Sequence, residues 1–388
     1  MEVRTLTGAD VLERLGPELD ELHAATGAPV TARRPWLAAW ARCHPEYESL
    51  ALLVQDGPRL EAAALLVRRK ARVVTEFFAL GTGLSDQARL PARDPEAAAR
   101  LARAVLAHLS SVPGPWHLRL RHLPPDDAVA SAIAAGLASA ELAPGDPSPS
   151  LRFGPARSLR AHVSKNHHQQ VRRMLNRMHG EGLTPELAHL RSRAAVAAVL
   201  PEVEDVCIRR DVELRGMSLF DRAGARAFFR EVLLEHAARN ELELTTLNLR
   251  GRLAAYVVCF LDRGAHRMWN CRLDPAWSRY GVGRVANNAA LERALADPEA
   301  GEFDWMRGDE PYKLSMSNHV ERALDLWAWS TPALRVALDS KRRLKSLVKG
   351  VVAEHEWLQP AFAASRRLKS AGRRAKRSVA DRLRRVRG

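Results

Sequence analysis

The same order of secondary-structure signals occurs twice along this chain, and this repeat restricts the fold more than any other feature. Each half predicts a helix, three consecutive strands, a glycine-containing loop, a second helix and a short strand. The three strands are expected at 50–54, 60–67 and 72–80 in the first half, and at 242–249, 253–261 and 266–273 in the second. The repeat predicts an α/β (α+β) fold of two similar modules in tandem, each a mostly antiparallel sheet flanked by helices.

Capping residues and prolines mark the helices that flank these strands. Pro35 suits the first turn of a short helix, and Asp94 with Pro95 begins a helix that runs to about Leu109. In the second half Asp221 is expected to cap a helix that ends near residue 239. Further elements are expected as a helix at 285–295 and strands at 116–120, 303–306 and 323–330.

These elements divide the chain into three parts. Residues 1–150 are expected to form the first module, in which a long loop containing Pro91 separates Gly81 and Gly83 from the next helix. Residues 151–332 form the working module, and residues 333–388 form a basic helical tail. The segment 157–182 has six basic residues before its first acidic one, with an apolar stripe of Met174, Leu175 and Met178 that predicts a docked basic helix.

The net charge of +15 invites a nucleic-acid interpretation, but its distribution is uneven. Residues 341–388 carry 16 Lys and Arg against three acidic residues, which leaves only +2 for residues 1–340. The basic character therefore belongs to the tail, whose apolar residues recur near helical spacing. We expect this basic amphipathic helix to contact an anionic membrane surface or tRNA, a solvated helix being the alternative.

The remaining composition is that of an ordinary globular protein, 46% hydrophobic and 27% charged. No leader or membrane-spanning pattern is found, so we expect a cytoplasmic protein, with peripheral membrane association through the tail. The four cysteines are widely spaced and form no C-x-x-C pair, which predicts free thiols. The adjacent His167 and His168 point about 100° apart on a helix, so we expect a solvated face and no metal site.

A glycine pair lies between the last strand of the second meander and the following helix. The loop comprises Arg279, Tyr280, Gly281, Val282, Gly283 and Arg284. Without Cβ atoms the backbone approaches a ligand closely, and the free N–H groups of the helix start then favour pyrophosphate oxygens. Arg279 and Arg284 would add charged contacts. A plain tight turn is the alternative interpretation.

A second constellation follows the short strand at 303–306. It contains Arg307, Asp309, Glu310, Tyr312 and Lys313. Acidic, phenolic and amine groups at the C-terminal end of a strand are the parts needed to deprotonate an attacking ammonium and to protonate a leaving thiolate. The alternative is a polar turn in which an acidic residue begins a short helix at Pro311.

Together these two motifs resemble the CelD/BcsL-like branch of the GNAT superfamily of acyltransferases, which is related to the Fem-type aminoacyltransferases. The likeness covers roughly residues 155–320 and is carried by residues 277–284 and 303–313, with Gly308-Asp309-Glu310-Pro311-Tyr312-Lys313 as its most specific part. Residues 164–175 also resemble the helix that begins this family's shared region. The chain departs from the usual GNAT pattern at Ser278, where Gln or Arg is common.

The resemblance implies direct transfer of an acyl group from acetyl-CoA or another acyl-CoA to an amine. Asp309 or Glu310 would be the general base, and Tyr312 would protonate the leaving group or only pack. Lys313 and Arg307 would bind substrate, with pairing of Lys313 to Asp309 as the alternative. The loop Arg279–Arg284 would bind the donor's phosphates, and no metal is implied.

The acceptor implied by the resemblance is a small-molecule or cell-envelope precursor amine. An aminoacyl-tRNA-dependent Fem-type reaction is the alternative function, and it would give the basic segment and the tail an RNA-binding role. A non-enzymatic basic adaptor is a third hypothesis. The sequence does not indicate acyl length or oligomeric state.

Overall fold

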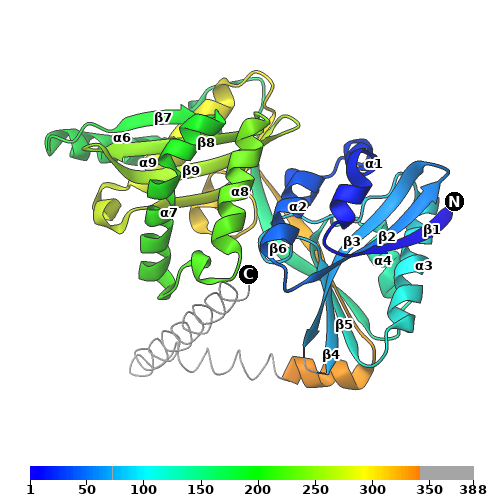
Figure 1. The fold of residues 1–388 in the computed structure, drawn as a ribbon. Coiled ribbons are helices and arrows are strands. Elements are labelled where there is room, and N and C mark those ends of the chain that lie inside the picture. Colours follow the sequence, from blue (N-terminus) through cyan, green and yellow to red (C-terminus); the bar gives the residue numbers. More distant parts are fainter. Residues whose placement is uncertain (72, 341–388) are drawn as a thin grey trace.

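The computed structural model describes residues 1–71 and 73–340. Residues 332–340 are helical, whereas the rest of the predicted basic tail lies outside the described residues. The described part is built on one twelve-stranded sheet with helices on both faces, and its two ends correspond to the two halves of the sequence (Figure 1). The mixed α/β fold predicted from the sequence is confirmed.

The first half contains six strands and four α-helices within the described residues. The strands are β1 (Glu2–Thr7), β2 (Glu48–Asp56), β3 (Arg59–Ala71), β4 (Val74–Ala79), β5 (Trp116–Leu123) and β6 (Ala140–Arg152). The helices are α1 (Val11–Ala25), α2 (Arg34–Cys43), α3 (Pro95–Ser111) and α4 (Ala128–Ala135), with a 3-10 turn η1 (Val30–Ala32). Asp94 caps α3 as expected, since its side chain accepts a hydrogen bond from the backbone of Ala97.

The second half repeats this order within the described residues. Its strands are β7 (Glu186–Leu190), β8 (Leu242–Leu249), β9 (Arg252–Asp262), β10 (Ala265–Leu273), β11 (Glu302–Asp304) and β12 (His319–Trp329). Its helices are α5 (Leu159–His162), α6 (Lys165–Gly180), α7 (Arg193–Arg215), α8 (Ala225–Ala238), α9 (Val282–Ala296) and α10 (Pro311–Ser315), with 3-10 turns η2 (Leu219–Asp221) and η3 (Pro275–Tyr280). The fourth and fifth strands pair in parallel in both halves, β4 with β5 and β10 with β11.

The last strands of the two halves are exchanged. The order across the sheet is β1-β2-β3-β4-β5-β12-β6-β11-β10-β9-β8-β7. Thus β12 pairs with β5 of the first half, β6 pairs with β11 of the second, and the two exchanged strands pair with each other. The boundary predicted at residue 150 falls within β6, and the division of the chain at 150 and 332 stays a prediction.

Three apolar clusters cover the sheet. One lies under α1, α2, α7 and α8 and joins both halves, with Trp36 and Phe260 in edge-to-face contact across them. The second lies under α6 and α9, and the third under α3 and α4. The predicted stripe on α6 is confirmed, because Met178 is fully buried and Met174 and Leu175 pack against the second cluster. All four cysteines are free, as expected.

One predicted helix start was wrong. The helix assigned to Asp221 begins at Ala225, and its N-cap is Gly224 in a left-handed conformation. Asp221 instead accepts a hydrogen bond from the backbone of Ser218 and so closes a capping box at η2. Asp221 therefore caps the short turn η2, whose C-cap is Arg222, and does not cap α8.

Candidate active site

The fourth and fifth strands of the second half separate soon after they begin. β10 and β11 pair only where Ala265–Arg267 face Glu302–Asp304, and the rest of β10 runs on to Leu273 without that partner. A pocket of about 390 Å³ lies at this end of β10. Its lining comes from six segments: His167; Arg210, Leu214 and Arg215; Tyr256; Cys271, Arg272 and Leu273; Gly283, Arg284 and Asn287; and Glu310, Tyr312, Ser315 and Met316.

Two residues of the predicted glycine loop, Gly283 and Arg284, line this pocket. η3 ends at Gly281, which has a φ of 66°, and α9 starts at once with Val282. A Cβ on Gly281 would lie 2.4 Å from Sδ of Met174, and one on Gly283 would lie 2.9 Å from Leu273. The left-handed backbone favours glycine at Gly281, and an added Cβ at either position would displace the neighbouring side chain. The N–H of Arg284 donates to the carbonyl of Gly281 at 2.9 Å, whereas the N–H groups of Val282 and Gly283 have no hydrogen-bond partner among the described residues.

The two arginines of the loop are placed differently. Arg284 lines the pocket. Arg279 lies outside it, two-thirds exposed, and pairs with Glu181 at 2.6 Å, while the hydroxyl of Tyr280 donates to the same carboxylate at 2.5 Å. Arg177 donates to the carbonyl of Arg279 at 2.8 Å, so α6 holds the outer side of the loop.

The segment after β11 is shaped by the exchanged strand β6. The backbone N–H of Trp305 donates to the carbonyl of Pro149 at 3.0 Å, and that of Gly308 donates to Pro147 at 2.9 Å. Met306 and Gly308 have positive φ values of 55° and 130°. A first-half strand thus fixes the strained turn that leads into α10.

Two of the predicted catalytic residues line the pocket. Glu310, whose side chain is 53% exposed, and Tyr312 do so, whereas Asp309 is also exposed but is absent from the lining. Lys313 is buried, donates to the carbonyl of Arg307 at 2.6 Å and pairs with Glu310 at 3.1 Å. Because Lys313 is committed to this turn and is absent from the pocket lining, it holds Glu310 in place and contributes no lining group.

The phenol of Tyr312 stays protonated. Its hydroxyl lies 3.8 Å from Sγ of Cys271. Burial, followed by the neighbouring Cys271 and Glu310, raises the pKa of Tyr312 well above its usual value. A protonated phenol beside a pocket is a proton donor.

Sequence reasoning missed several lining residues. His167, expected on a solvated face, is buried, and its Nε2 lies 3.0 Å from Oδ1 of Asn288 on α9. Burial lowers the pKa of His167. The signal that could have revealed it is its place one turn before the apolar stripe of α6, at Val171, Met174 and Met178.

Arg272 lies on the opposite face of β10 from α9. Its Nε donates to Asp211 of α7 at 2.9 Å, and its Nη1 donates to the carbonyl of Cys271 at 2.7 Å. Tyr256 stands beside it and donates to Asn270 at 2.7 Å. No motif in the sequence marks these residues, because packing of α7 brings Arg210, Asp211 and Arg215 to the strand. Asp211 and its partner Arg272 are 61 residues apart.

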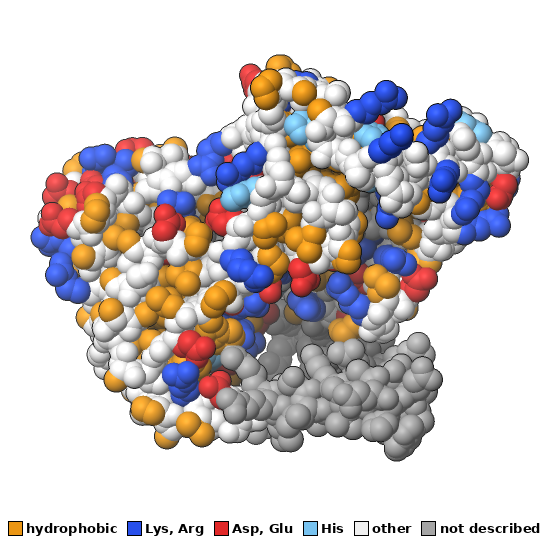
Figure 2. Space-filling view, turned by 180° about the vertical axis from the view of Figure 1, so that it is seen from behind, with side chains coloured by type: hydrophobic (Ala, Val, Ile, Leu, Met, Phe, Trp, Pro, Cys, Tyr) orange, Lys and Arg blue, Asp and Glu red, His pale blue; other side chains and the backbone are white. Residues whose placement is uncertain are grey.

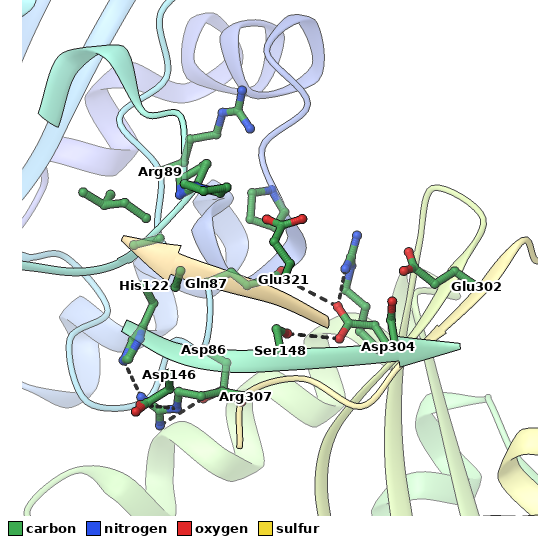
Figure 3. A pocket seen from close by; sticks show the side chains of 18 of the residues that line it. Asp86, Gln87, Arg89, His122, Asp146, Ser148, Glu302, Asp304, Arg307 and Glu321 are labelled. Atoms are coloured by element: carbon green, nitrogen blue, oxygen red, sulfur yellow. Dashed lines mark hydrogen bonds and ion pairs between the residues drawn. The ribbon is translucent and has the colours of Figure 1, made fainter. Parts of the chain in front are cut away.

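Arg307 points into a different pocket, of about 540 Å³, between the two halves (Figure 3). It pairs with Asp86 at 3.2 Å and with Nε2 of His122 from the first half. Burial raises the pKa of Asp86 to about 6, and burial and Arg307 lower that of His122 to about 3. Nearby, Asp304 accepts from Arg267 at 2.6 Å and from Gln87 at 3.3 Å. Arg307 thus joins the halves and is separate from Glu310 and Tyr312.

Residues 1–71 and 73–340 contain neither a cluster of metal ligands nor a membrane-spanning helix. No group of three or more His, Cys, Asp or Glu side chains there is arranged to hold a metal ion. No helix in that part of the chain combines the length and apolar character needed to cross a membrane.

Comparisons with known proteins agree with this architecture. Residues 165–314 match the family model of the acetyltransferase (GNAT) domain. The matched region contains the glycine loop, Glu310 and Tyr312, so this part of the chain is similar to the GNAT acyltransferases. No curated protein sequence matches the chain.

Solved structures place the fold beside that of the Fem-type enzymes. FemX superposes with a TM-score of 0.58 at 9% identity, over 87% of this chain and 99% of that one. L-PGS from Bacillus licheniformis gives 0.53 at 12% identity, over 85% and 96%. The C-terminal domain of a putative lysylphosphatidylglycerol synthetase from Agrobacterium fabrum gives 0.52 at 10% identity, also over 85% and 96%. The likeness is one of fold, and the CelD/BcsL-like assignment stays a prediction.

Proposed function

We propose that this protein transfers an acyl group from an acyl-CoA thioester directly to an amine in the pocket lined by Glu310 and Tyr312. The observation that carries the proposal is that the glycine loop, the start of α9 and these two side chains meet at one pocket, where β10 and β11 separate. Free N–H groups and Arg284 suit the phosphates of CoA, which would place the thioester toward Tyr312.

The reaction follows from these groups. Glu310 takes a proton from the acceptor ammonium, and the amine lone pair then forms the C–N bond to the thioester carbonyl carbon. The C–S bond breaks, its electron pair leaves with sulfur, and Tyr312 donates a proton to that thiolate. The nitrogen loses its second proton to solvent, Glu310 releases the proton it took, and the phenolate regains one from solvent. The products are therefore an amide, free CoA thiol and one proton.

Ligand-dependent stability and thiol release test this proposal. Acetyl-CoA and longer acyl-CoAs should raise the melting temperature, and a panel of amines should give CoA thiol and amide in equal amounts. The variant Arg284→Gln should weaken the stabilisation by acyl-CoA about tenfold in apparent affinity. Absence of both stabilisation and thiol release across the donor series would refute the proposal.

An aminoacyl-tRNA donor is the second candidate, and a basic groove favours it. A hollow of about 250 Å³ lies on the outer side of the glycine loop and is lined by Gln170, Arg173, Met174, Arg177, Ser278, Arg279 and Gly281. The exposed Lys165 and Arg172 extend this basic surface along α6, which carries no acidic residue. Figure 2 shows Lys and Arg side chains gathered at this end of the molecule.

Ribonuclease treatment distinguishes the two donors. A tRNA-dependent enzyme would lose activity when ribonuclease is added to a reaction supplied with aminoacyl-tRNA, and would gain no stability from acyl-CoA. Arg173→Gln and Arg177→Gln would then weaken donor binding and reduce its dependence on salt. Membrane or tRNA contacts of residues 341–388 form a separate proposal, which liposome and tRNA binding by the full chain and by a chain ending at residue 340 would test.

A further inference from the structure

The pocket that contains Glu310 has two chemically different sides. α9 and the glycine loop contribute Gly283, Arg284 and Asn287 from one face of the sheet. From the other face, α7 and the strands contribute Arg210, Arg215, Tyr256 and Arg272. Because the proposed donor occupies the glycine-loop side, the α7 side is left for the acceptor.

The arginines on the α7 side have hydrogen-bond donors without a partner among the described residues. Arg272 is anchored through Nε and Nη1, and among the described residues its Nη2 has no hydrogen-bond partner. Arg215 is exposed at the end of α7, and it forms no ion pair with residues 1–71 or 73–340. Arg210 is already paired with Glu213. Arg215 and Arg272 thus remain available to a ligand in the pocket.

The negative charge of the lining is small by comparison. Glu310 is its only carboxylate, and Lys313 already neutralises it at 3.1 Å. A plain alkylammonium acceptor is expected to bind weakly, because its positive charge would be repelled by the arginines of a partly desolvated pocket. An acceptor that carries an anion as well as an amine would be attracted by the same arginines.

We infer that the acceptor of this enzyme is an amine that also bears a carboxylate or phosphate, which binds Arg215 and Arg272. The inference rests on the proposed function of the pocket and names its substrate class. The anion sits on the α7 side, and its amine faces Glu310 and the thioester. Leu214, exposed beside Arg215, gives the entrance an apolar contact for the rest of the acceptor.

The same charges help to release the amine's proton. The charged or titratable groups around the pocket come from six elements: Arg210 and Arg215 from α7, Tyr256 from β9, Arg272 and Cys271 from β10, Arg284 from α9, His167 from α6, and Glu310 and Tyr312 from the segment after β11. Four of these are permanent cations, and two of them are already paired, Arg210 with Glu213 and Arg272 with Asp211. Arg215 and Arg284 form no ion pair within the described residues, so they disfavour an ammonium and lower the pKa of a bound amine. A single carboxylate already paired with Lys313 then suffices as the base.

Matched acceptors test the inference. With acetyl-CoA as donor, kcat/KM is measured for glycine against methylamine, L-phenylalanine against 2-phenylethylamine, and O-phosphoethanolamine against ethanolamine. In at least one pair, kcat/KM should be about 10- to 100-fold higher for the anionic member, which is the effect expected of one hydrogen bond to a charged group. The first two pairs report a carboxylate site, and the third reports a phosphate site.

Variants of the α7 side locate the effect. Arg215→Gln should raise KM for the anionic acceptor about tenfold and so lower the kcat/KM ratio between the anionic and the plain amine. Stabilisation by acetyl-CoA should be unchanged. Arg215→Lys should restore part of the preference for the anionic amine. Arg239→Gln, on an exposed ion pair with Glu235, is the control and should change nothing. If plain amines react as well as their anionic partners, the inference is overturned although the proposed function stands. If acetyl-CoA neither binds nor turns over, the proposed function itself fails.

Discussion

The glycine loop permits a test in which steric contact is separated from backbone strain. Gly281 and Gly216 have nearly identical left-handed conformations, with φ values of 66° and 67°. An added Cβ at Gly216 would meet nothing within 4 Å, whereas at Gly281 it would meet Sδ, Cε and Cγ of Met174 at 2.4, 2.7 and 2.9 Å. Gly216→Ala is therefore a matched control for Gly281→Ala.

The expected magnitudes follow from these distances. Gly216→Ala should lower the free energy of unfolding by about 1–2 kcal/mol, the cost of a left-handed non-glycine residue. Gly281→Ala should add about 1–3 kcal/mol for overpacking, toward the lower end because a methionine side chain adapts readily. The total is then about 2–4 kcal/mol, and the loop and α6 are forced apart.

Urea denaturation and acyl-CoA titration measure both consequences. Gly281→Ala should also weaken acyl-CoA binding, whereas Gly216→Ala should not. Adding Met174→Ala should recover most of the excess loss of Gly281→Ala, so that the double mutant is non-additive. Equal destabilisation by the two glycine substitutions, with no coupling to Met174, would refute the steric reasoning.

Three further predictions concern catalysis and pH. Glu310→Gln should lower kcat by about 10²- to 10⁴-fold with unchanged acyl-CoA affinity, while the exposed Asp309→Asn changes it little; the reverse ranking would contradict the assignment. Tyr312→Phe should slow transfer from acetyl-CoA but not from an acyl thiophenol ester, whose leaving group needs no proton, and equal slowing of both would exclude the proton-donor role. Burial lowers the pKa of His23 to about 4, so below its usual pKa of 6.5 the unfolded chain binds the proton first and stability falls as the pH drops from 6.5 to 4. His23→Leu should make that fall shallower by up to about 3 kcal/mol, and an unchanged slope in urea melts would show that His23 is not responsible.

Local patterns in the sequence predicted most elements of the meanders and their helices. Apolar runs in the sequence predicted β2 to β4 and β8 to β10 correctly, because each of these strands is buried against elements of its own half. β6 was missed for a physical reason. Its Pro144, Pro147 and Pro149 argue against a strand, yet their carbonyls remain free to accept, and those of Pro147 and Pro149 bond to the segment after β11.

The candidate site was predictable only where its residues are close in sequence. The glycine loop and Gly308–Lys313 are contiguous motifs, and the structure places Gly283, Arg284, Glu310 and Tyr312 on one pocket. The α7 arginines and His167 come from other elements and are brought there by packing. The resemblance implied that Arg307 and Lys313 bind substrate, but Arg307 points into the pocket between the two halves and Lys313 into the turn before α10, where it pairs with Glu310.

The exchange of β6 and β12 also bears on how the protein is synthesised. Arg121 of β5 donates to Asp325 of the neighbouring strand β12, and these two residues are 204 positions apart in the chain. The first half therefore leaves the ribosome long before the strand that completes its sheet. Until then one edge of β5 is unpaired, and β6 lacks its partner strands β11 and β12. Such long-range pairing is slow and leaves strand edges open to other chains. The nascent first half is therefore expected to depend on chaperones until translation passes residue 329, and a ribosome-release experiment with stalled chains of increasing length would follow this dependence.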